Sequence, residues 1–174
     1  MILGSYYDWL REPFQKTLIM GIVNVTPDSF SDGGLYYQDE TASSHAVKLL
    51  ENGADIIDVG GESTRPGAVE VSEEEEISRV LPVIKQIRNI SPNTIISIDT
   101  TKSNVARCAI EAGANIINDI SGLTKDPAMV EVGAEFQVPI VIMHMQGNPL
   151  NMQKKPYYKD IIADISKFFS DQIK

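Results

Sequence analysis

The amino-acid sequence predicts an α/β fold in which parallel strands alternate with helices. Apolar segments of strand length, rich in Ile and Val, recur five times along the 174 residues, and each is followed by a segment with helical periodicity. A short internal repeat supports this order, because residues 53–58 (Gly-Ala-Asp-Ile-Ile-Asp) recur as residues 113–118 (Gly-Ala-Asn-Ile-Ile-Asn). Strand–helix–strand units of this kind have right-handed crossovers and form a parallel sheet. The chain is too short to close an eight-stranded barrel, which typically needs about 250 residues.

Strands are expected where apolar residues run without interruption into a polar segment. The expected strands are residues 17–24, 55–59, 95–98, 115–119 and 139–143. The first of them can be buried on both faces, as in the interior of a parallel sheet covered by helices. The aromatic residues 1–15 are expected to form a short lead-in that packs across one end of the sheet.

Helices are expected between these strands. They are predicted at residues 41–52, 73–90, 127–136 and 158–174, with a further helix that ends at Gly113. The start of the 73–90 helix has a clear signal, because Ser72 can cap it while Glu75 reaches back in a capping box. The acidic run 73–76 complements the positive end of the helix dipole, and we interpret it as capping rather than as a ligand site.

Composition restricts the classes of partner. The chain has 15 Lys plus Arg against 24 Asp plus Glu, and its net charge of −9 argues against a nucleic-acid or anionic-membrane surface. An anionic ligand would therefore need a local cluster of donors or a metal. The single cysteine, Cys108, cannot form an internal disulfide, and it is expected to be a small buried helix residue. With neither a membrane-length apolar run nor an export signal in residues 1–14, a single cytoplasmic domain is expected.

Polar residues gather where the predicted strands end. In a parallel sheet these carboxyl ends share one rim, where α/β proteins place their active sites. Asp58 and Asp119 could instead cap backbone amides, and His144 could be a core histidine. Asp99 is harder to explain structurally, because a carboxylate that closes an apolar strand needs hydrogen-bond donors. The residues in question are Asn24, Asp58, Asp99, Asn118, Asp119 and His144.

From Lys16 onward the sequence resembles the dihydropteroate synthase family. The resemblance is carried by residues 24–34 (Asn-Val-Thr-Pro-Asp-Ser-Phe-Ser-Asp-Gly-Gly), 58–67 (Asp-Val-Gly-Gly-Glu-Ser-Thr-Arg-Pro-Gly), 97–100 (Ser-Ile-Asp-Thr), 116–119 (Ile-Ile-Asn-Asp) and 143–149 (Met-His-Met-Gln-Gly-Asn-Pro). That family has a TIM (β/α)₈ barrel of the pterin-binding type. The resemblance therefore implies a lead-in at residues 1–15 and a partial barrel domain, about (βα)₅, at residues 16–174.

The resemblance also implies an activity, the condensation of (7,8-dihydropterin-6-yl)methyl diphosphate with 4-aminobenzoate to dihydropteroate and pyrophosphate in folate biosynthesis. Asn24 would bind Mg²⁺ that bridges diphosphate oxygens, which with Arg65 would neutralise the anion. Thr64 would contact the substrate that carries the diphosphate. Asp99 and Asn118 would hydrogen-bond the pterin edge, and the negative charge of Asp99 would stabilise the cation that forms as pyrophosphate leaves.

Further residues follow from the same resemblance. Ile120 and Met143 would flank the pterin ring. Phe30, Thr64 and Pro66 would line the 4-aminobenzoate slot, for which sulfonamides would compete. In the family these two loops close over the bound pterin, and Ser31 and Asp32 would help to fasten the closed form. A homodimer is one possible assembly.

The family's later motifs, on strands six to eight, have no counterpart in these 174 residues. Three interpretations are open. The chain can be the N-terminal portion of an ordinary synthase, a non-catalytic pterin-binding fragment completed by another chain, or a pterin-binding domain of a corrinoid-type methyltransferase. The loops at 25–34 and 63–68 argue against the methyltransferase, which has no need of an aminobenzoate slot. The first and last strands would be unpaired edges.

Overall fold

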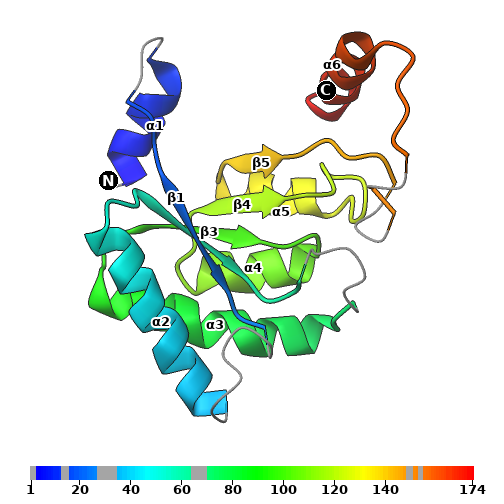
Figure 1. The fold of residues 1–174 in the computed structure, drawn as a ribbon. Coiled ribbons are helices and arrows are strands. Elements are labelled where there is room, and N and C mark those ends of the chain that lie inside the picture. Colours follow the sequence, from blue (N-terminus) through cyan, green and yellow to red (C-terminus); the bar gives the residue numbers. More distant parts are fainter. Residues whose placement is uncertain (1–2, 13–15, 27–34, 64–69, 148–150, 153–154) are drawn as a thin grey trace.

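The fold is described from a computed structural model of residues 3–12, 16–26, 35–63, 70–147, 151–152 and 155–174. Six helices and five strands alternate over these residues (Figure 1). Their bounds are α1 Leu3–Arg11, β1 Met20–Asn24, α2 Leu35–Glu51, β2 Ile56–Gly60, α3 Glu73–Ile90, β3 Ile95–Asp99, α4 Ser103–Glu111, β4 Ile116–Asp119, α5 Met129–Phe136, β5 Ile140–Ile142 and α6 Ile161–Gln172.

The strands form one sheet in the order β1-β2-β3-β4-β5, and every neighbouring pair is parallel. This sequential order, without a reversal of direction, is that of a barrel segment rather than of a doubly wound sheet. The predicted parallel α/β fold is therefore confirmed. Strands β1 and β5 are the edges of this sheet, as the sequence predicted.

Most predicted elements have the predicted type, with ends that differ by a few residues. The largest difference is α2, which begins at Leu35 rather than at residue 41. The prediction relied on the stripe of small and apolar residues further along the helix, from Ala42 onward. Residues 3–11 of the lead-in form a helix, α1, which the sequence analysis did not predict.

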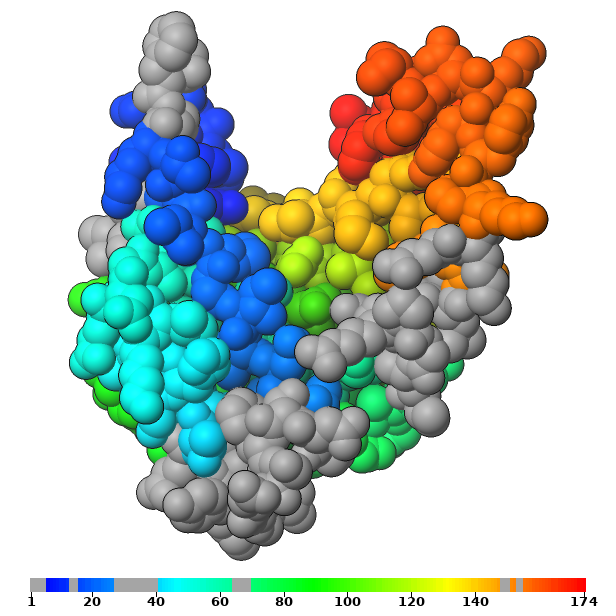
Figure 2. Space-filling model, viewed as in Figure 1, coloured from blue at the N-terminus to red at the C-terminus, as the bar shows by residue number. Residues whose placement is uncertain are grey.

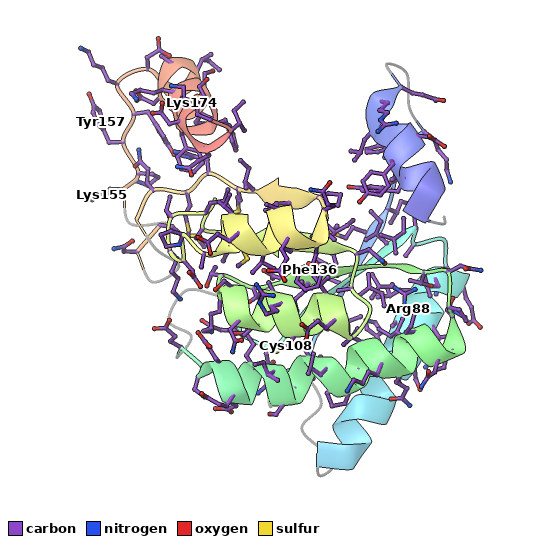
Figure 3. All side chains as sticks on the ribbon, turned by 180° about the vertical axis from the view of Figure 1, so that it is seen from behind. Arg88, Cys108, Phe136, Lys155, Tyr157 and Lys174 are labelled. Carbon is purple, nitrogen blue, oxygen red and sulfur yellow. The ribbon has the colours of Figure 1, made fainter. Side chains whose placement is uncertain are left out.

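Helix α3 begins as its sequence indicates. The Ser72 hydroxyl accepts a hydrogen bond from the Glu75 amide at 3.2 Å, so the N-cap is confirmed. The second half of the predicted capping box is wrong, because the Glu75 carboxylate accepts from Arg79 at 2.5 Å instead. At the other end of α3, Arg88 donates to backbone oxygens of the turns before β3 and β4, including Thr94 at 2.8 Å and Gly113 at 2.6 Å (Figure 3).

The repeated segment folds the same way twice. Gly53 and Gly113 end their helices at φ of 100° and 116°, a conformation that glycine adopts without strain. Two residues later the side chain satisfies a backbone amide of the preceding strand segment. Asp55 Oδ2 accepts from Ile19 N at 3.1 Å, and Asn115 Oδ1 accepts from Ile96 N at 3.1 Å. The two repeats thus make equivalent contacts at the amino ends of the strands.

The hydrophobic core lies between the sheet and helices α2–α5, which cover one face of it (Figure 1). Alternate strand residues such as Val59 and Ile98 point into this core and are fully buried. Cys108 of α4 is half-buried and makes no disulfide, so its predicted full burial is wrong (Figure 3).

The other face of the sheet is the inner face of the partial barrel. At the amino ends of the strands, Tyr6 of α1 packs against a layer formed by Ile56, Ile95 and Ile116. The Tyr7 hydroxyl also donates to the backbone oxygen of Gln137 at 3.1 Å, which ties α1 to the turn before β5. Helix α1 therefore covers the amino end of this inner face.

The inner face is open along the two edge strands. Ile22 of β1 is 58% exposed, so the prediction that the first strand is buried on both faces is wrong. Only the helix-facing side of β1 is covered, because the helices pack on the other face of the sheet from Ile22. Helix α6 has no buried residue and exposes 75% of Ile162. Figure 2 shows the resulting hollow between α1 and the segment that carries α6.

Candidate functional site

Four residues stand side by side at the carboxyl ends of β1 to β4. The register aligns Asn24 with Gly60, Gly60 with Asp99, and Asp99 with Asn118. In a parallel sheet, aligned residues present their side chains to the same face, here the inner one. The structure therefore brings together three of the predicted site residues, Asn24, Asp99 and Asn118.

Gly60 keeps the space between two of these side chains open. A Cβ at this position would lie 3.5 Å from the Asn24 side-chain oxygen and 3.5 Å from Asp99 Oδ2. Both oxygens therefore border the point where the side chain of any other residue would stand. A methyl group at this point would be in ordinary van der Waals contact with an amide oxygen and a carboxylate.

Asn118 is held from below by Asp58. Its Nδ2 donates to Asp58 Oδ2 at 3.2 Å, although the two residues lie on β4 and β2 with β3 between them. The interpretation of Asp58 as a backbone cap is wrong. Among the described residues its Oδ1 has no hydrogen-bond partner, and its side chain is 3% exposed. Burial raises the pKa of Asp58, and the donors of Ser97 and Asn118 oppose this rise.

Asp119 has the structural role that the sequence allowed. Its two carboxylate oxygens accept from the amides of Ser121 at 2.8 Å and Leu123 at 3.1 Å. Leu123 has a φ of 67°, so Asp119 supports a turn that a branched residue adopts at some cost. Asp119 is thus a backbone cap directly beside the candidate site.

Asp99 is the most perturbed titratable group at this rim. Burial raises its pKa to about 7, and the negative charges of Asp58, Glu76, Asp119 and Glu62 act in the same direction. A hydrogen-bond donor or a positive charge placed beside a carboxyl group with a raised pKa stabilises its ionised form. Such a carboxyl group therefore favours a ligand that brings either one. This is the environment expected of a group that recognises a polar ligand.

A buried ion network lies next to Asp99. Lys102 Nζ donates to Glu76 at 2.6 Å and also to Glu62, and Glu76 is 1% exposed. Burial alone would lower the pKa of Lys102, but the two carboxylates outweigh it and the pKa is raised. The sequence analysis missed this network, because it assigned the whole acidic run to capping. The signal was present, since position 76 falls on the buried stripe of α3 with Val80.

His144 and its neighbours form the end of the site near β5. The imidazole packs on the rings of Phe168 and Tyr158, with centroids 4.8 and 5.8 Å away, so it is half-buried by aromatic side chains of the α6 region. Met143 is 38% exposed at the end of β5, and Ile120 is half-buried directly after β4. These two residues border the rim on the side of Asn118.

Six predicted site residues lie outside the described residues, and the structure makes no statement about them. Three belong to the first polar loop and three to the second. They are Phe30, Ser31, Asp32, Thr64, Arg65 and Pro66.

The described residues of the rim can contribute an oxygen ligand to a metal site. No cluster of three or more His, Cys, Asp or Glu side chains suited to a metal ion occurs among the described residues. Mg²⁺, however, is commonly bound through one or two protein oxygens, with phosphate and water as the other ligands. The exposed amide oxygen of Asn24, beside the gap over Gly60, fits that donor set.

In the part of the chain that the structure describes, no helix has the length and apolar character required to cross a membrane.

Comparison with known proteins decides the family. The family described as pterin binding enzyme matches residues 20–174 of this chain. The chain belongs to the pterin-binding enzyme family. The dihydropteroate synthase of Synechocystis is 47% identical over 169 residues, covering 97% of this chain and 57% of that protein. The Escherichia coli synthase is 51% identical over 155 residues, covering 89% and 54%. The chain thus spans about half the length of these relatives, and the resemblance to dihydropteroate synthase is confirmed for an N-terminal portion.

Solved structures of pterin-binding enzymes support the fold. Dihydropteroate synthase of Xanthomonas albilineans with 4-aminobenzoic acid superposes with a TM-score of 0.81 and 45% identity, over 91% of this chain and 55% of that one. The Yersinia pestis synthase with a sulfonamide drug gives a TM-score of 0.82 and 48% identity, over 91% and 57%. The predicted fold class, part of a TIM barrel, is therefore confirmed.

Proposed function

We propose that this chain carries the pterin-recognition rim of a dihydropteroate synthase. The reaction is the condensation of (7,8-dihydropterin-6-yl)methyl diphosphate with 4-aminobenzoate in folate biosynthesis. The observation that carries the proposal is the pair formed by Asp99 and Asn118, aligned on neighbouring strands at the mouth of the inner face. Relatives with this name that cover 89–97% of the chain support it.

Asp99 and Asn118 suit the edge of a pterin. The aminopyrimidinone edge offers N–H donors together with an acceptor, which match a carboxylate and an amide. The raised pKa of Asp99, about 7, means that the ionised carboxylate gains from these donors and from any positive charge on the ring. Ile120 and Met143 would flank the ring from the β4 and β5 sides.

The same residues would assist the chemical step. When the C–O bond to the diphosphate breaks, positive charge develops on the methylene and the conjugated pterin, and the Asp99 carboxylate stabilises it. The aniline nitrogen of 4-aminobenzoate then forms the new C–N bond and releases a proton. An aromatic amine is unprotonated at neutral pH, so it needs orientation more than deprotonation.

Asn24 would hold Mg²⁺, which when bound neutralises the diphosphate as pyrophosphate leaves. Arg65 and Thr64 are proposed to contact the diphosphate-bearing substrate. Phe30 and Pro66 are proposed to line the aminobenzoate slot, with Ser31 and Asp32 fastening the loop above it. Sulfonamides are proposed as competitors for that slot, in line with the sulfonamide complex of the Yersinia pestis relative. A cytoplasmic location and a homodimer are proposed with the activity.

The test is binding of pteroic acid to the 174-residue chain, measured by calorimetry, for the native sequence and for Asp99→Ala. Loss of a charge-assisted contact should weaken binding by about tenfold or more. Glu135→Gln is the matched control, since Glu135 is an exposed acid on α5 that pairs with Arg107. Equal affinity in all three proteins would refute the pterin role of Asp99.

Turnover tests the complete reaction. Dihydropteroate formation is measured with Mg²⁺, the pterin diphosphate and 4-aminobenzoate, alongside the native mass of the chain. Because the chain spans about half of its relatives, turnover is expected only after the remaining strands are supplied as a second polypeptide or in one longer chain. A full-length protein that binds the pterin but forms no dihydropteroate would contradict the proposed reaction.

A further inference from the structure

We propose that Asp58 is a positioning residue that orients the side-chain amide of Asn118, so that the site selects ligands by an N–H group offered to Asn118 Oδ1. This inference rests on the proposed function, because it concerns how the same rim recognises a pterin. Asp58 itself does not touch the ligand. Its Oδ1 is inaccessible to solvent and its side chain is 3% exposed.

The geometry of a barrel explains why these two residues meet. Within one layer of a barrel interior, side chains come from alternate strands, because neighbouring strands are staggered. Asp58 on β2 and Asn118 on β4 are such alternate positions, and the Asn118 Nδ2 to Asp58 Oδ2 distance is 3.2 Å. On β3, between them, Ser97 is aligned with Asp58 and Asp99 with Asn118.

The chemistry of the pair fixes which end of the amide faces outward. An ionised carboxylate accepts hydrogen bonds and donates none, so it binds the NH₂ end of Asn118 and repels the oxygen end. Asn118 Oδ1 is then the end available to the mouth of the barrel. A ligand at that position must present a donor, and one that presents an acceptor leaves two oxygens opposed without a proton between them.

The surroundings of Asp58 keep this orientation in place. Ser97, fully buried beside it, has an Oγ that makes no hydrogen bond of normal geometry within the described residues, yet its hydroxyl is close enough to favour the charged carboxylate. The donors near Asp58 are therefore the hydroxyl of Ser97 and the amide of Asn118. Rotation of the Asn118 amide would remove the N–H group from which Asp58 Oδ2 accepts a hydrogen bond.

The experiment compares two probes that differ at one position of the ring. Pterin has an amino donor at position 2, and lumazine has a carbonyl acceptor there. The affinity of the 174-residue chain for each probe gives a selectivity ratio, which a general loss of structure would not change. The native chain should prefer pterin by about tenfold or more, the effect of a mismatched buried hydrogen bond.

Asp58→Asn should lower that ratio to about threefold or less, because Asn at 58 can donate as well as accept and so permits the Asn118 amide to rotate. Glu135→Gln, at an exposed acid of α5 that pairs with Arg107, is the control and should keep the native ratio. An unchanged ratio in Asp58→Asn overturns the assignment, whether the two affinities stay as they were or fall by the same factor. A native chain that binds neither probe would overturn the proposed function, and the assignment with it.

A measurement without ligand separates these outcomes. Exchange of the Asn118 Nδ2 protons with solvent, followed by NMR, should be slowed about tenfold or more relative to an exposed asparagine such as Asn93. The protection should be lost in Asp58→Ala if that protein is folded. Fast exchange in the native chain overturns the assignment even where the proposed function survives.

Discussion

The centre of the sheet and its edges differ in how completely the chain surrounds them. Strands β2 and β3 are buried on both faces, whereas β1 exposes Ile22 and β5 exposes Val141 to the inner side. Asp58, Asp99 and Asn118 lie on the central strands or on β4 beside them. Their hydrogen bonds and charges are therefore set by neighbouring parts of this same chain.

The difference shows that the recognition rim at the centre of the sheet and the edge strands are stabilised by different contacts. The centre depends on the helix-facing core and on a buried ion network, both of which the described residues supply. The edges carry apolar side chains that gain little free energy from the contacts present. Substitutions should therefore have large effects at the centre and small ones at the edges.

The largest effect is expected for Lys102→Met. Without the ammonium group, Glu76 would remain buried as an unpaired charge beside Glu62, which should lower the free energy of unfolding by about 3–5 kcal/mol. Urea unfolding measures the loss. Lys125→Met is the control, because Lys125 pairs with the exposed Glu70 and should cost less than about 1 kcal/mol. Similar losses in both variants would mean that the buried network does not support the centre.

A second pair of substitutions compares the two regions directly. Ile98→Ala removes a fully buried side chain from the helix-facing core and should cost about 2–5 kcal/mol. Ile22→Ala removes a side chain that is 58% exposed and should cost less than about 1 kcal/mol. Thermal and urea unfolding measure both. A loss at Ile22 as large as that at Ile98 would show that the inner face of β1 is covered in solution.

The third prediction concerns pH. The pKa of Asp99 is raised to about 7 in the folded chain, so between about pH 4 and 7 the native state holds a proton that the unfolded state has lost. This contribution to stability is complete at low pH and is lost as the pH rises through 7. Asp99→Asn has no such proton to lose, so it should be more stable than the native chain by about 4 kcal/mol at pH 8.

At pH 4 the Asp99→Asn and native chains should have similar stability. Urea unfolding at the two pH values measures the difference. The same variant should lose pteroic acid binding, since stability and recognition conflict at a strained site. A difference in stability that is the same at both pH values would refute the assigned pKa.

Much of this could be predicted from sequence because the signals were local. Periodicity and the Ser72 cap predicted α3, and the strand ends placed Asn24, Asp99 and Asn118 on one rim. Longer-range contacts could not be predicted. The hydrogen bond from Asn118 to Asp58 spans 60 residues and depends on the stagger of the strands.

The acidic run shows a second limit. Four consecutive Glu residues at 73–76 are equally compatible with a solvated helix start, and composition does not reveal that one of them meets Lys102, 26 residues away. Exposure of β1 was mispredicted for a related reason. Apolar sequence reports what a strand can bury, but whether a neighbour covers it is a property of the whole assembly.

The repeat at residues 53–58 and 113–118 has a consequence for the depth of the rim. Asp55 and Asn115 each fasten a neighbouring strand segment at the amino end of the sheet, and three residues later come Asp58 and Asn118. The spacing from anchor to site is thus the same in both units. A one-residue insertion in either would turn its site residue toward the helices. The contacts at the amino ends of the strands therefore fix the register in which Asp58 and Asn118 meet near the carboxyl ends.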